Sequence, residues 1–217
     1  MKKPSRAVLF DLDGTLADTA PDLAAALNRL RAEQGLEPLP LERLRPFASA
    51  GARGLVHVGF GIKPGDGEYA SLREAFLEYY RDRTCVETTL FPGIAELLEA
   101  LAARGVAWGI VTNKATRFTD RIVSKLNLRP DCIASGDTTP HLKPHPAPLL
   151  HAAGQLGLAP KHCLYLGDDL RDIQAARAAG MRPIAVDWGY HHPDNGGPGT
   201  WQADAVIARP QELIGLL

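Results

Sequence analysis

The feature that most constrains this chain is the apolar run at residues 7–10, which ends abruptly at two carboxylates, Asp11 and Asp13. Because alternate residues of a strand share a face, both side chains can point into one site where the strand ends. Close anions repel each other, so this placement predicts a metal-assisted site at the mouth of a buried strand. Gly14 and Thr15 follow, and we expect both to bind substrate, since glycine lets the backbone approach a ligand and threonine offers a hydroxyl and an N–H.

Apolar runs alternate with helix-like segments along most of the chain, as in repeated βαβ units. Their nearly continuous hydrophobicity indicates strands buried on both faces of a parallel sheet, and right-handed crossovers would stack them into a doubly wound α/β fold. The predicted strands span residues 7–10, 106–111, 132–135, 163–166, 183–186 and 205–207, and two intervening helices span residues 93–104 and 170–179.

Residues 18–88 break this rhythm, because no strand of comparable quality is predicted there. One predicted helix begins around Pro21 and ends before Gly35, and a second spans residues 69–83. The glycines between them, including the stretch at residues 51–54, predict turns or linkers. We interpret the segment as a helical insertion over the carboxyl end of the first strand, where it can act as a lid. The predicted domains are a catalytic core of residues 1–17 and 89–217 and a helical cap domain of residues 18–88.

Polar side chains also follow three other predicted strands, which is where open α/β sheets place their ligand sites. A phosphate ester needs cationic or N–H partners for its oxygens, an in-line nucleophile, and an acid for the leaving oxygen. These side chains and the first two aspartates supply each of these groups. The additional candidates are Thr112, Asn113, Lys143, Asp168, Asp169 and Asp172.

In this interpretation Asp11 attacks phosphorus to give an aspartyl-phosphate. Asp13 protonates the departing alkoxide and then deprotonates the hydrolytic water. Thr112 and the neighbouring N–H would hold the phosphoryl oxygens, and Lys143 would neutralise the charge that develops in the transition state. Asn113 is counted with them among the catalytic residues.

The two aspartates can hold different roles only if their environments separate their pKa values, which a metal bound by Asp11 but not by the Asp13 side chain would do. Mg²⁺ suits such a site, because it prefers an octahedron of oxygens with retained waters and one or two carboxylates. Asp11, Asp168, a backbone carbonyl and the phosphate would supply this shell, and Asp13 counts among the residues of the metal site. Asp172 is better placed to orient the lysine or a metal-bound water, and Asp169 is either a supporting residue or a direct ligand.

Charge and cysteine content narrow the class of protein. Lys plus Arg is 24 and Asp plus Glu is 25, so no excess charge favours a nucleic acid or an anionic membrane surface as a partner. The three cysteines lack metal-ligand spacing, which fits free thiols in a reducing cytosol. Residues 2–10 are too short a stretch for a signal peptide or a membrane helix, so we expect a cytoplasmic protein that acts on a small-molecule phosphate ester.

Four motifs occur in sequence order, namely Asp11-Leu12-Asp13-Gly14-Thr15, Val111-Thr112-Asn113, Lys143-Pro144 and Gly167-Asp168-Asp169. Together they resemble the motifs of the haloacid dehalogenase superfamily. A chance Asp-X-Asp-Gly-Thr alone would arise in a chain of this length on the order of once in a thousand. The resemblance implies a Rossmann-like core with a helical cap inserted after the first strand, and Mg²⁺-dependent hydrolysis of phosphomonoesters.

The helical cap and the helix that ends at Gly180 are similar to those of the phosphoglycolate phosphatase group within the superfamily. The segments at residues 111–118, 167–173, 189–193 and 201–204 more finely resemble its bacterial branch that acts on N-acetylmuramic acid 6-phosphate. This similarity implies a small acidic organic or sugar phosphate as substrate, either N-acetylmuramic acid 6-phosphate or 2-phosphoglycolate. Two alternatives stay open, a phosphosugar mutase of the same family and a non-catalytic phosphate-sensing domain that is phosphorylated on Asp11. The leaving-group acid at Asp13 favours an enzyme over a sensing domain.

Some polar residues allow a second interpretation. Arg53 of the cap could bind a substrate carboxylate bidentately, or it could lie on a solvated helix face. His191 and His192 could suggest zinc, but they have no Cys or His at ligand spacing nearby, which favours a surface loop. His57, beside glycine-rich turns, is more consistent with a structural role.

Overall fold

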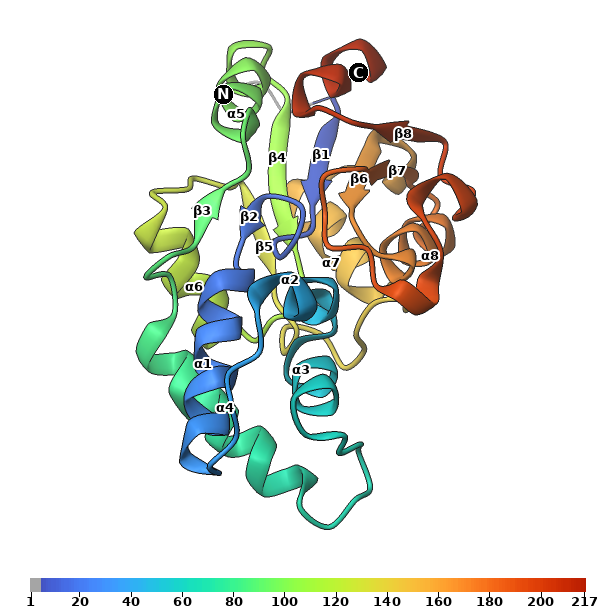
Figure 1. The fold of residues 1–217 in the computed structure, drawn as a ribbon. Coiled ribbons are helices and arrows are strands. Elements are labelled where there is room, and N and C mark those ends of the chain that lie inside the picture. The colour runs from blue at the N-terminus through green and yellow to red at the C-terminus, as the bar shows by residue number, and fades with distance from the viewer. Residues whose placement is uncertain (1–4) are drawn as a thin grey trace.

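The computed structural model describes residues 5–217, so Lys2 and Lys3, on which part of the prediction about the N-terminus rests, lie outside the described residues. Six parallel strands form one sheet in the order β5-β4-β1-β6-β7-β8 (Figure 1). The predicted doubly wound sheet is confirmed, and every strand lies within one residue of its predicted bounds. The strands are β1 (Ala7–Phe10), β4 (Ala107–Val111), β5 (Cys132–Ala134), β6 (Cys163–Gly167), β7 (Arg182–Val186) and β8 (Ala205–Ile207).

Strand β1 occupies the middle of the sheet, because all of its residues are apolar and can be covered on both faces. It pairs with β4 on one side and β6 on the other. The chain builds outward from β1 through β4 and β5, and then returns to add β6, β7 and β8 on the opposite side. Such a reversal opens a crevice at the carboxyl ends of the strands, where ligands bind in open α/β sheets. Asp11 follows β1 directly at this point.

Helices cover both faces of the sheet, and the pleat of β1 separates the two apolar clusters. Val8 and Phe10 face a cluster that contains the apolar residues of α5, whereas Ala7 and Leu9 face an alanine-rich cluster with α7 and α8. None of the helices in residues 5–217 has the length and hydrophobicity that a membrane crossing requires. The helices that connect the strands are α5 (Ile94–Ala103), α6 (Thr116–Lys125), α7 (Ala147–Leu156) and α8 (Leu170–Ala179).

A layer of four helices lies beyond the carboxyl ends of the strands, at the bottom of Figure 1. This layer has a hydrophobic cluster of its own, formed chiefly by leucines of α1 and aromatic residues of α4. Phe118 and Tyr190 join that cluster from the sheet-bearing part of the chain. The helices are α1 (Ala20–Glu33), α2 (Leu41–Leu44), α3 (Gly51–Phe60) and α4 (Tyr69–Arg83), with a 3-10 segment at Arg45–Ala50 between α2 and α3.

The prediction of turns at residues 51–54 and at Gly59 is wrong, because these residues form α3. Both Gly54 and Gly59 are buried within the helix. A Cβ added to Gly59 would lie 2.9 Å from the Cδ1 atom of Leu27, so the missing side chain allows α3 to pack closely against α1. Glycine serves here for helix packing, a role that the local sequence does not distinguish from a turn.

The two ends of the helical layer are joined where the chain leaves and re-enters the sheet-bearing part. Two short strands, β2 (Ala17–Asp18) and β3 (Thr89–Leu90), pair antiparallel at this junction. Buried Asp22 in the first turn of α1 accepts hydrogen bonds from the backbone N–H groups of Val86, Glu87 and Thr88. Two-residue strands carry no hydrophobic pattern, which is why the sequence did not reveal them.

Candidate active site

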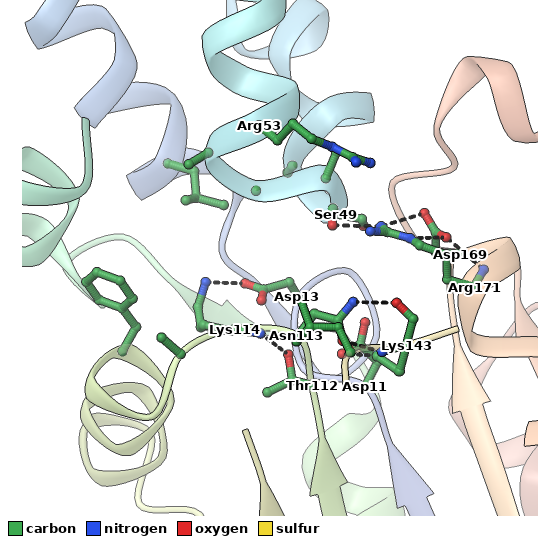
Figure 2. Close-up of a pocket in the computed structure, with 18 of the residues that line it drawn as sticks. Asp11, Asp13, Ser49, Arg53, Thr112, Asn113, Lys114, Lys143, Asp169 and Arg171 are labelled. Carbon is green, nitrogen blue, oxygen red and sulfur yellow. Dashed lines mark hydrogen bonds and ion pairs between the residues drawn. The ribbon is translucent and has the colours of Figure 1, made fainter. Parts of the chain in front are cut away.

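A cavity of about 500 Å³ lies between the carboxyl edge of the sheet and the helical layer. Figure 2 shows Asp11 and Thr112 at the ends of the strands, with Arg53 of α3 on the opposite side of the cavity. Most of the residues predicted for the site therefore meet in one place. Those that line the cavity are Asp11, Asp13, Arg53, Thr112, Asn113, Lys143, Asp169 and Asp172.

The carboxyl edge of the sheet forms the floor of the cavity, and three buried carboxylates gather there. Oxygen atoms of Asp11, Asp168 and Asp172 lie within 4.8 Å of one another, and each side chain is nearly inaccessible to solvent. Burial raises the pKa of Asp168 well above its usual value, and the neighbouring charges of Asp11 and Asp172 raise it further. Burial also raises the pKa of Asp172, to about 7, although the lysine beside it acts in the opposite direction. This concentration of oxygen donors and negative charge fits a divalent cation.

One oxygen of this cluster has few protein contacts. Oδ1 of Asp11 is buried and makes no contact with hydrogen-bond geometry, although Nζ of Lys143 lies 2.9 Å away. A carboxylate oxygen has more than one lone pair, so its ion pair with this ammonium leaves capacity for a further ligand. The atom therefore supports the fit of a cation or a substrate oxygen at Asp11.

Three hydrogen-bond donors hold the side chain of Asp168. It accepts hydrogen bonds from Oγ1 of Thr15 at 3.2 Å, from Oγ of Ser49 at 3.0 Å and from the backbone N–H of Tyr190 at 2.9 Å. A Cβ on Gly14 would lie 2.1 Å from an oxygen of Asp168, so only glycine leaves room for this carboxylate. Gly14 and Thr15, which were expected to bind substrate, thus contact Asp168 and do not line the cavity.

The ammonium of Lys143 lies beside two of these three carboxylates. Its Nζ atom contacts Oδ1 of Asp11 at 2.9 Å, Oδ1 of Asp172 at 2.7 Å and the hydroxyl of Tyr165 at 2.8 Å. Burial lowers the pKa of Lys143, but the charges of Asp11 and Asp172 together outweigh burial and leave the pKa raised. Lys143 is therefore a permanent cation beside the carboxylate predicted to be the nucleophile.

The side chain of Asn113 positions the backbone of Lys143. Its Nδ2 atom donates to the carbonyl of Lys143 at 3.0 Å, and its Oδ1 atom accepts from the N–H of Lys143 at 2.9 Å. Both ends of the amide are engaged by the protein, so Asn113, which the sequence counts among the catalytic residues, fixes the lysine loop. Thr112 is buried beside it, and its hydroxyl accepts from the N–H of Lys114 at 3.2 Å.

Asp169 and Asp172 also begin helix α8. Asp169 accepts from the N–H of Arg171 at 2.9 Å, and Asp172 reaches back to accept from the N–H of Asp169 at 3.1 Å, which forms a capping box. The guanidinium of Arg171 pairs with Asp169 at 2.8 Å and donates to the carbonyl of Ser49 at 2.9 Å. Asp169 lies outside the three-carboxylate cluster, so its contacts are those of a helix cap and an ion-pair partner.

Asp13 has a different set of partners from Asp11. Its Oδ1 atom lies 2.8 Å from Nζ of Lys114 and also accepts a hydrogen bond from the hydroxyl of Thr19 (Figure 2 shows the lysine contact). Its carboxylate is not part of the three-carboxylate cluster. The two aspartates of the first motif thus have separate partners, each beside its own lysine.

The sequence interpretation gave no role to several residues that the structure brings to the site. Lys114 directly follows Asn113, and the polar run after β4 was a signal that could have identified it. Ser49, Arg171 and Tyr190 carry no such local signal, because each has a contact with a residue more than 100 positions away along the chain. These contacts join Ser49 to Asp168, Arg171 to the carbonyl of Ser49, and the hydroxyl of Tyr190 to Asp18. Tyr190 additionally accepts a hydrogen bond at its hydroxyl from the N–H of Thr19 at 2.7 Å.

The residues with two possible interpretations lie outside the acidic floor. Arg53 is exposed on α3 and lines the cavity, whereas His57 is exposed on the same helix and does not line it. His191 contacts the carbonyl of Val186 at 2.9 Å, and the ring of His192 packs against Phe47. Neither histidine belongs to the one cluster in residues 5–217 that could hold a metal ion.

Comparison with known proteins identifies a family and close relatives. The family model described as haloacid dehalogenase-like hydrolase matches residues 8–186. A Pseudomonas aeruginosa protein named N-acetylmuramic acid 6-phosphate phosphatase is 43% identical over 214 residues, which cover 98% of this chain and 94% of that protein. A phosphoglycolate phosphatase from Xanthomonas campestris pv. campestris is also 43% identical, over 210 residues that cover 96% and 94%. The crystal structure of a predicted phosphoglycolate phosphatase from Haemophilus somnus 129pt is similar with a TM-score of 0.85 and 28% identity, covering 100% of this chain and 99% of that one.

Proposed function

The chain belongs to the haloacid dehalogenase-like hydrolases, and from this premise we propose that it is a phosphatase that hydrolyses a small, carboxylate-bearing phosphate ester with Mg²⁺. The proposal is carried by one observation. Two carboxylates from a single strand end, Asp11 and Asp13, lie on the floor of one cavity, and each is beside its own buried lysine.

Asp11 is the nucleophile in this proposal. Its carboxylate attacks phosphorus, a bond from Oδ to phosphorus forms, the bond to the leaving oxygen breaks, and an aspartyl-phosphate results. Lys143 holds a fixed positive charge 2.9 Å from Asp11, where it can neutralise charge on the phosphoryl oxygens. Thr112 and the N–H groups after β4 line the cavity beside it and can donate to the same oxygens.

Asp13 is the acid and base. It transfers a proton to the leaving oxygen in the first step, and in the second step it removes a proton from the water that hydrolyses the aspartyl-phosphate. Thr19 and Lys114 orient its carboxylate from the side of the helical layer and of the loop after β4.

Asp11, Asp168 and Asp172 offer the oxygen atoms that would hold Mg²⁺. When bound, the cation would neutralise charge on the phosphoryl group and orient it for in-line attack. Asp11 and Asp172 each have Lys143 as a close cation, whereas Asp168 has no positively charged partner among residues 5–217, which supports its role as a ligand. Removal of divalent metal with EDTA should therefore abolish turnover, and added Mg²⁺ should restore it.

The helical layer at residues 18–88 is the part that would select the substrate. A cavity of about 500 Å³ falls in the range that accommodates drug-sized ligands, which favours a sugar-sized ester such as N-acetylmuramic acid 6-phosphate over the two-carbon 2-phosphoglycolate. Three arginines line its outer part and, among the described residues, have no carboxylate within ion-pair distance. We assign the substrate carboxylate to these arginines, Arg53, Arg73 and Arg117. Three free cysteines support a reducing, cytoplasmic location.

The test is to measure kcat/KM with Mg²⁺ for N-acetylmuramic acid 6-phosphate and 2-phosphoglycolate side by side, with the Asp11→Asn variant as a control. A preference for the amino sugar supports the assignment from cavity volume, and a preference for phosphoglycolate contradicts it while retaining the phosphatase. If neither ester nor a panel of sugar phosphates is hydrolysed, the phosphatase proposal is wrong. Phosphorylation of Asp11 by a small donor would in that case point to a mutase or a phosphate-sensing domain.

A further inference from the structure

The hydroxyl of Tyr80 is a buried polar group without a full hydrogen bond. Tyr80 lies in α4, its side chain is 1% exposed, and the ammonium of Lys114 faces its hydroxyl without the geometry of a full hydrogen bond; no other described residue hydrogen-bonds the hydroxyl. Such groups are rare in folded proteins, because each loses its hydrogen bonds to water without replacement. Of the three buried side-chain atoms in residues 5–217 that lack a hydrogen bond, two belong to the cavity, Oδ1 of Asp11 and the hydroxyl of Tyr80.

Aromatic packing prevents the ring of Tyr80 from turning to find a partner. Phe76 stacks on it with ring centroids 6.3 Å apart, and Phe118 packs at 5.0 Å. Nζ of Lys114 lies 4.8 Å from the ring centroid on the side of the cavity. Burial raises the pKa of Tyr80 to about 12, so the hydroxyl keeps its proton at neutral pH and can donate it to an acceptor.

Lys114 has hydrogen-bonding capacity beyond its ion pair. An ammonium carries three donors, and within residues 5–217 the one carboxylate close to it is Asp13, at 2.8 Å. Its side chain is 8% exposed and lines the same cavity. Tyr80 and Lys114 therefore place a hydroxyl and an ammonium together beside Asp13.

The place of the Tyr80 hydroxyl and the Lys114 ammonium beside Asp13 indicates which part of a substrate they would contact. In the proposed reaction Asp11 approaches phosphorus from one side, and Asp13 protonates the oxygen that leaves on the other side. Atoms of the leaving alcohol next to that oxygen must lie beside Asp13, and thus beside Lys114 and Tyr80. The arginines Arg53 and Arg73 lie on the helices of the layer opposite and are available for a more distant anionic group.

We propose that Tyr80 and Lys114 form a subsite for the leaving alcohol, where they hydrogen-bond an oxygen acceptor carried within a few bonds of the ester oxygen. This inference rests on the proposed phosphatase function. It makes the two residues determinants of specificity, which favour polyoxygenated leaving groups such as sugars over leaving groups that carry no acceptor near the ester. The hydroxyl left without a full hydrogen bond in the free protein is satisfied when substrate binds.

The test is the Tyr80→Phe variant, which removes one oxygen and leaves the packed ring. With N-acetylmuramic acid 6-phosphate, kcat/KM should fall roughly ten-fold, the value of one hydrogen bond. With p-nitrophenyl phosphate, which has no acceptor near its ester oxygen, kcat/KM should be unchanged. The melting temperature of the free protein should be unchanged or higher, because the variant removes a buried group that has no full hydrogen bond.

Tyr79→Phe is the matched control, since it makes the same chemical change on the same helix. The Tyr79 hydroxyl bonds to Glu33 at an exposed position, so this variant should leave both substrates unaffected. A double-mutant cycle with Lys114→Met should show that Tyr80→Phe costs less once Lys114 is absent, because both donors serve one acceptor.

Three results would overturn the inference: full kcat/KM of Tyr80→Phe on the sugar phosphate, an equal loss on both substrates, or strict additivity in the cycle. These results differ from a failure of the proposed function, in which the wild-type protein hydrolyses none of the esters and the inference fails with it.

Discussion

Replacement of Asp22 by alanine should destabilise the protein strongly, although Asp22 lies outside the cavity. The side chain is fully buried, and its carboxylate accepts hydrogen bonds from three backbone N–H groups and from the hydroxyl of Thr88, at 2.7 to 3.0 Å. These bonds tie the start of α1 to the segment in which the chain returns to the sheet. Asp22→Ala removes all of them and offers no substitute acceptor.

The size of the loss in the free energy of unfolding depends on how many buried N–H and O–H donors the variant leaves without an acceptor. Val86 and Glu87 are exposed, so water can reach their N–H groups, whereas Thr88 is 5% exposed and its N–H and hydroxyl would stay dry. A stranded buried donor costs about 1–3 kcal/mol, so the two donors of Thr88 together predict a loss of about 3 kcal/mol in the free energy of unfolding. For a chain of this length that loss lowers the melting temperature by roughly 6–12 °C.

Urea and thermal unfolding of the purified variant measure this loss. Asp22→Asn keeps one acceptor oxygen and should lose about 1 kcal/mol, and Asp120→Ala, at an exposed position on α6, should stay within about 0.5 kcal/mol of the wild type. The reasoning is refuted if Asp22→Ala unfolds at the same urea concentration as the Asp120→Ala control. That outcome would mean that water or a rearranged loop satisfies the donors of Thr88.

Three further predictions concern the cavity. Asp11→Asn should abolish phosphatase turnover while the melting temperature changes little, and measurable wild-type-like turnover would contradict the role of Asp11 as nucleophile. Asn113→Ala removes two hydrogen bonds from the Lys143 loop, so kcat should fall by roughly 30-fold, corresponding to about 2 kcal/mol, with a smaller change in KM. A loss confined to KM in steady-state kinetics would instead assign the amide to substrate binding. Arg53→Ala should raise KM for a carboxylate-bearing ester and leave KM for p-nitrophenyl phosphate unchanged, and equal KM values for the acidic ester in variant and wild type would place Arg53 on the solvated face.

The site residues that directly follow strands could be predicted, because the position of a strand end fixes where they lie. Asp11 and Asp13 share a face through the period of a strand, and the carboxyl ends of parallel strands meet at one edge, which brings Thr112, Lys143 and Asp168 to the same place. The sheet itself could be predicted because strands that are buried on both faces have continuous apolar sequences.

Residues that act through distant contacts could not be predicted in this way. The amide of Asn113 resembles a phosphate-binding group in sequence, yet it is occupied by the backbone of Lys143, 30 residues away. Gly14 is next to Asp13 in sequence, yet the side chain for which it leaves room is that of Asp168, which follows strand β6. Gly59 is a residue type that is common in turns, yet it lies within α3 where that helix contacts α1.

The sequence by itself determined the parallel α/β sheet, the place of the acidic site at its carboxyl edge and the class of chemistry, because these depend on periodicity and on the order of strands. Only the tertiary structure decided how the charges are shared. It pairs Asp13 with Lys114, gathers Asp11 with Asp168 and Asp172, and places the buried hydroxyl of Tyr80 beside Lys114 at the cavity. The reason is physical: a hydrogen bond or an ion pair acts over a few ångströms, so its existence depends on where the folded backbone places two residues, whatever their separation along the chain.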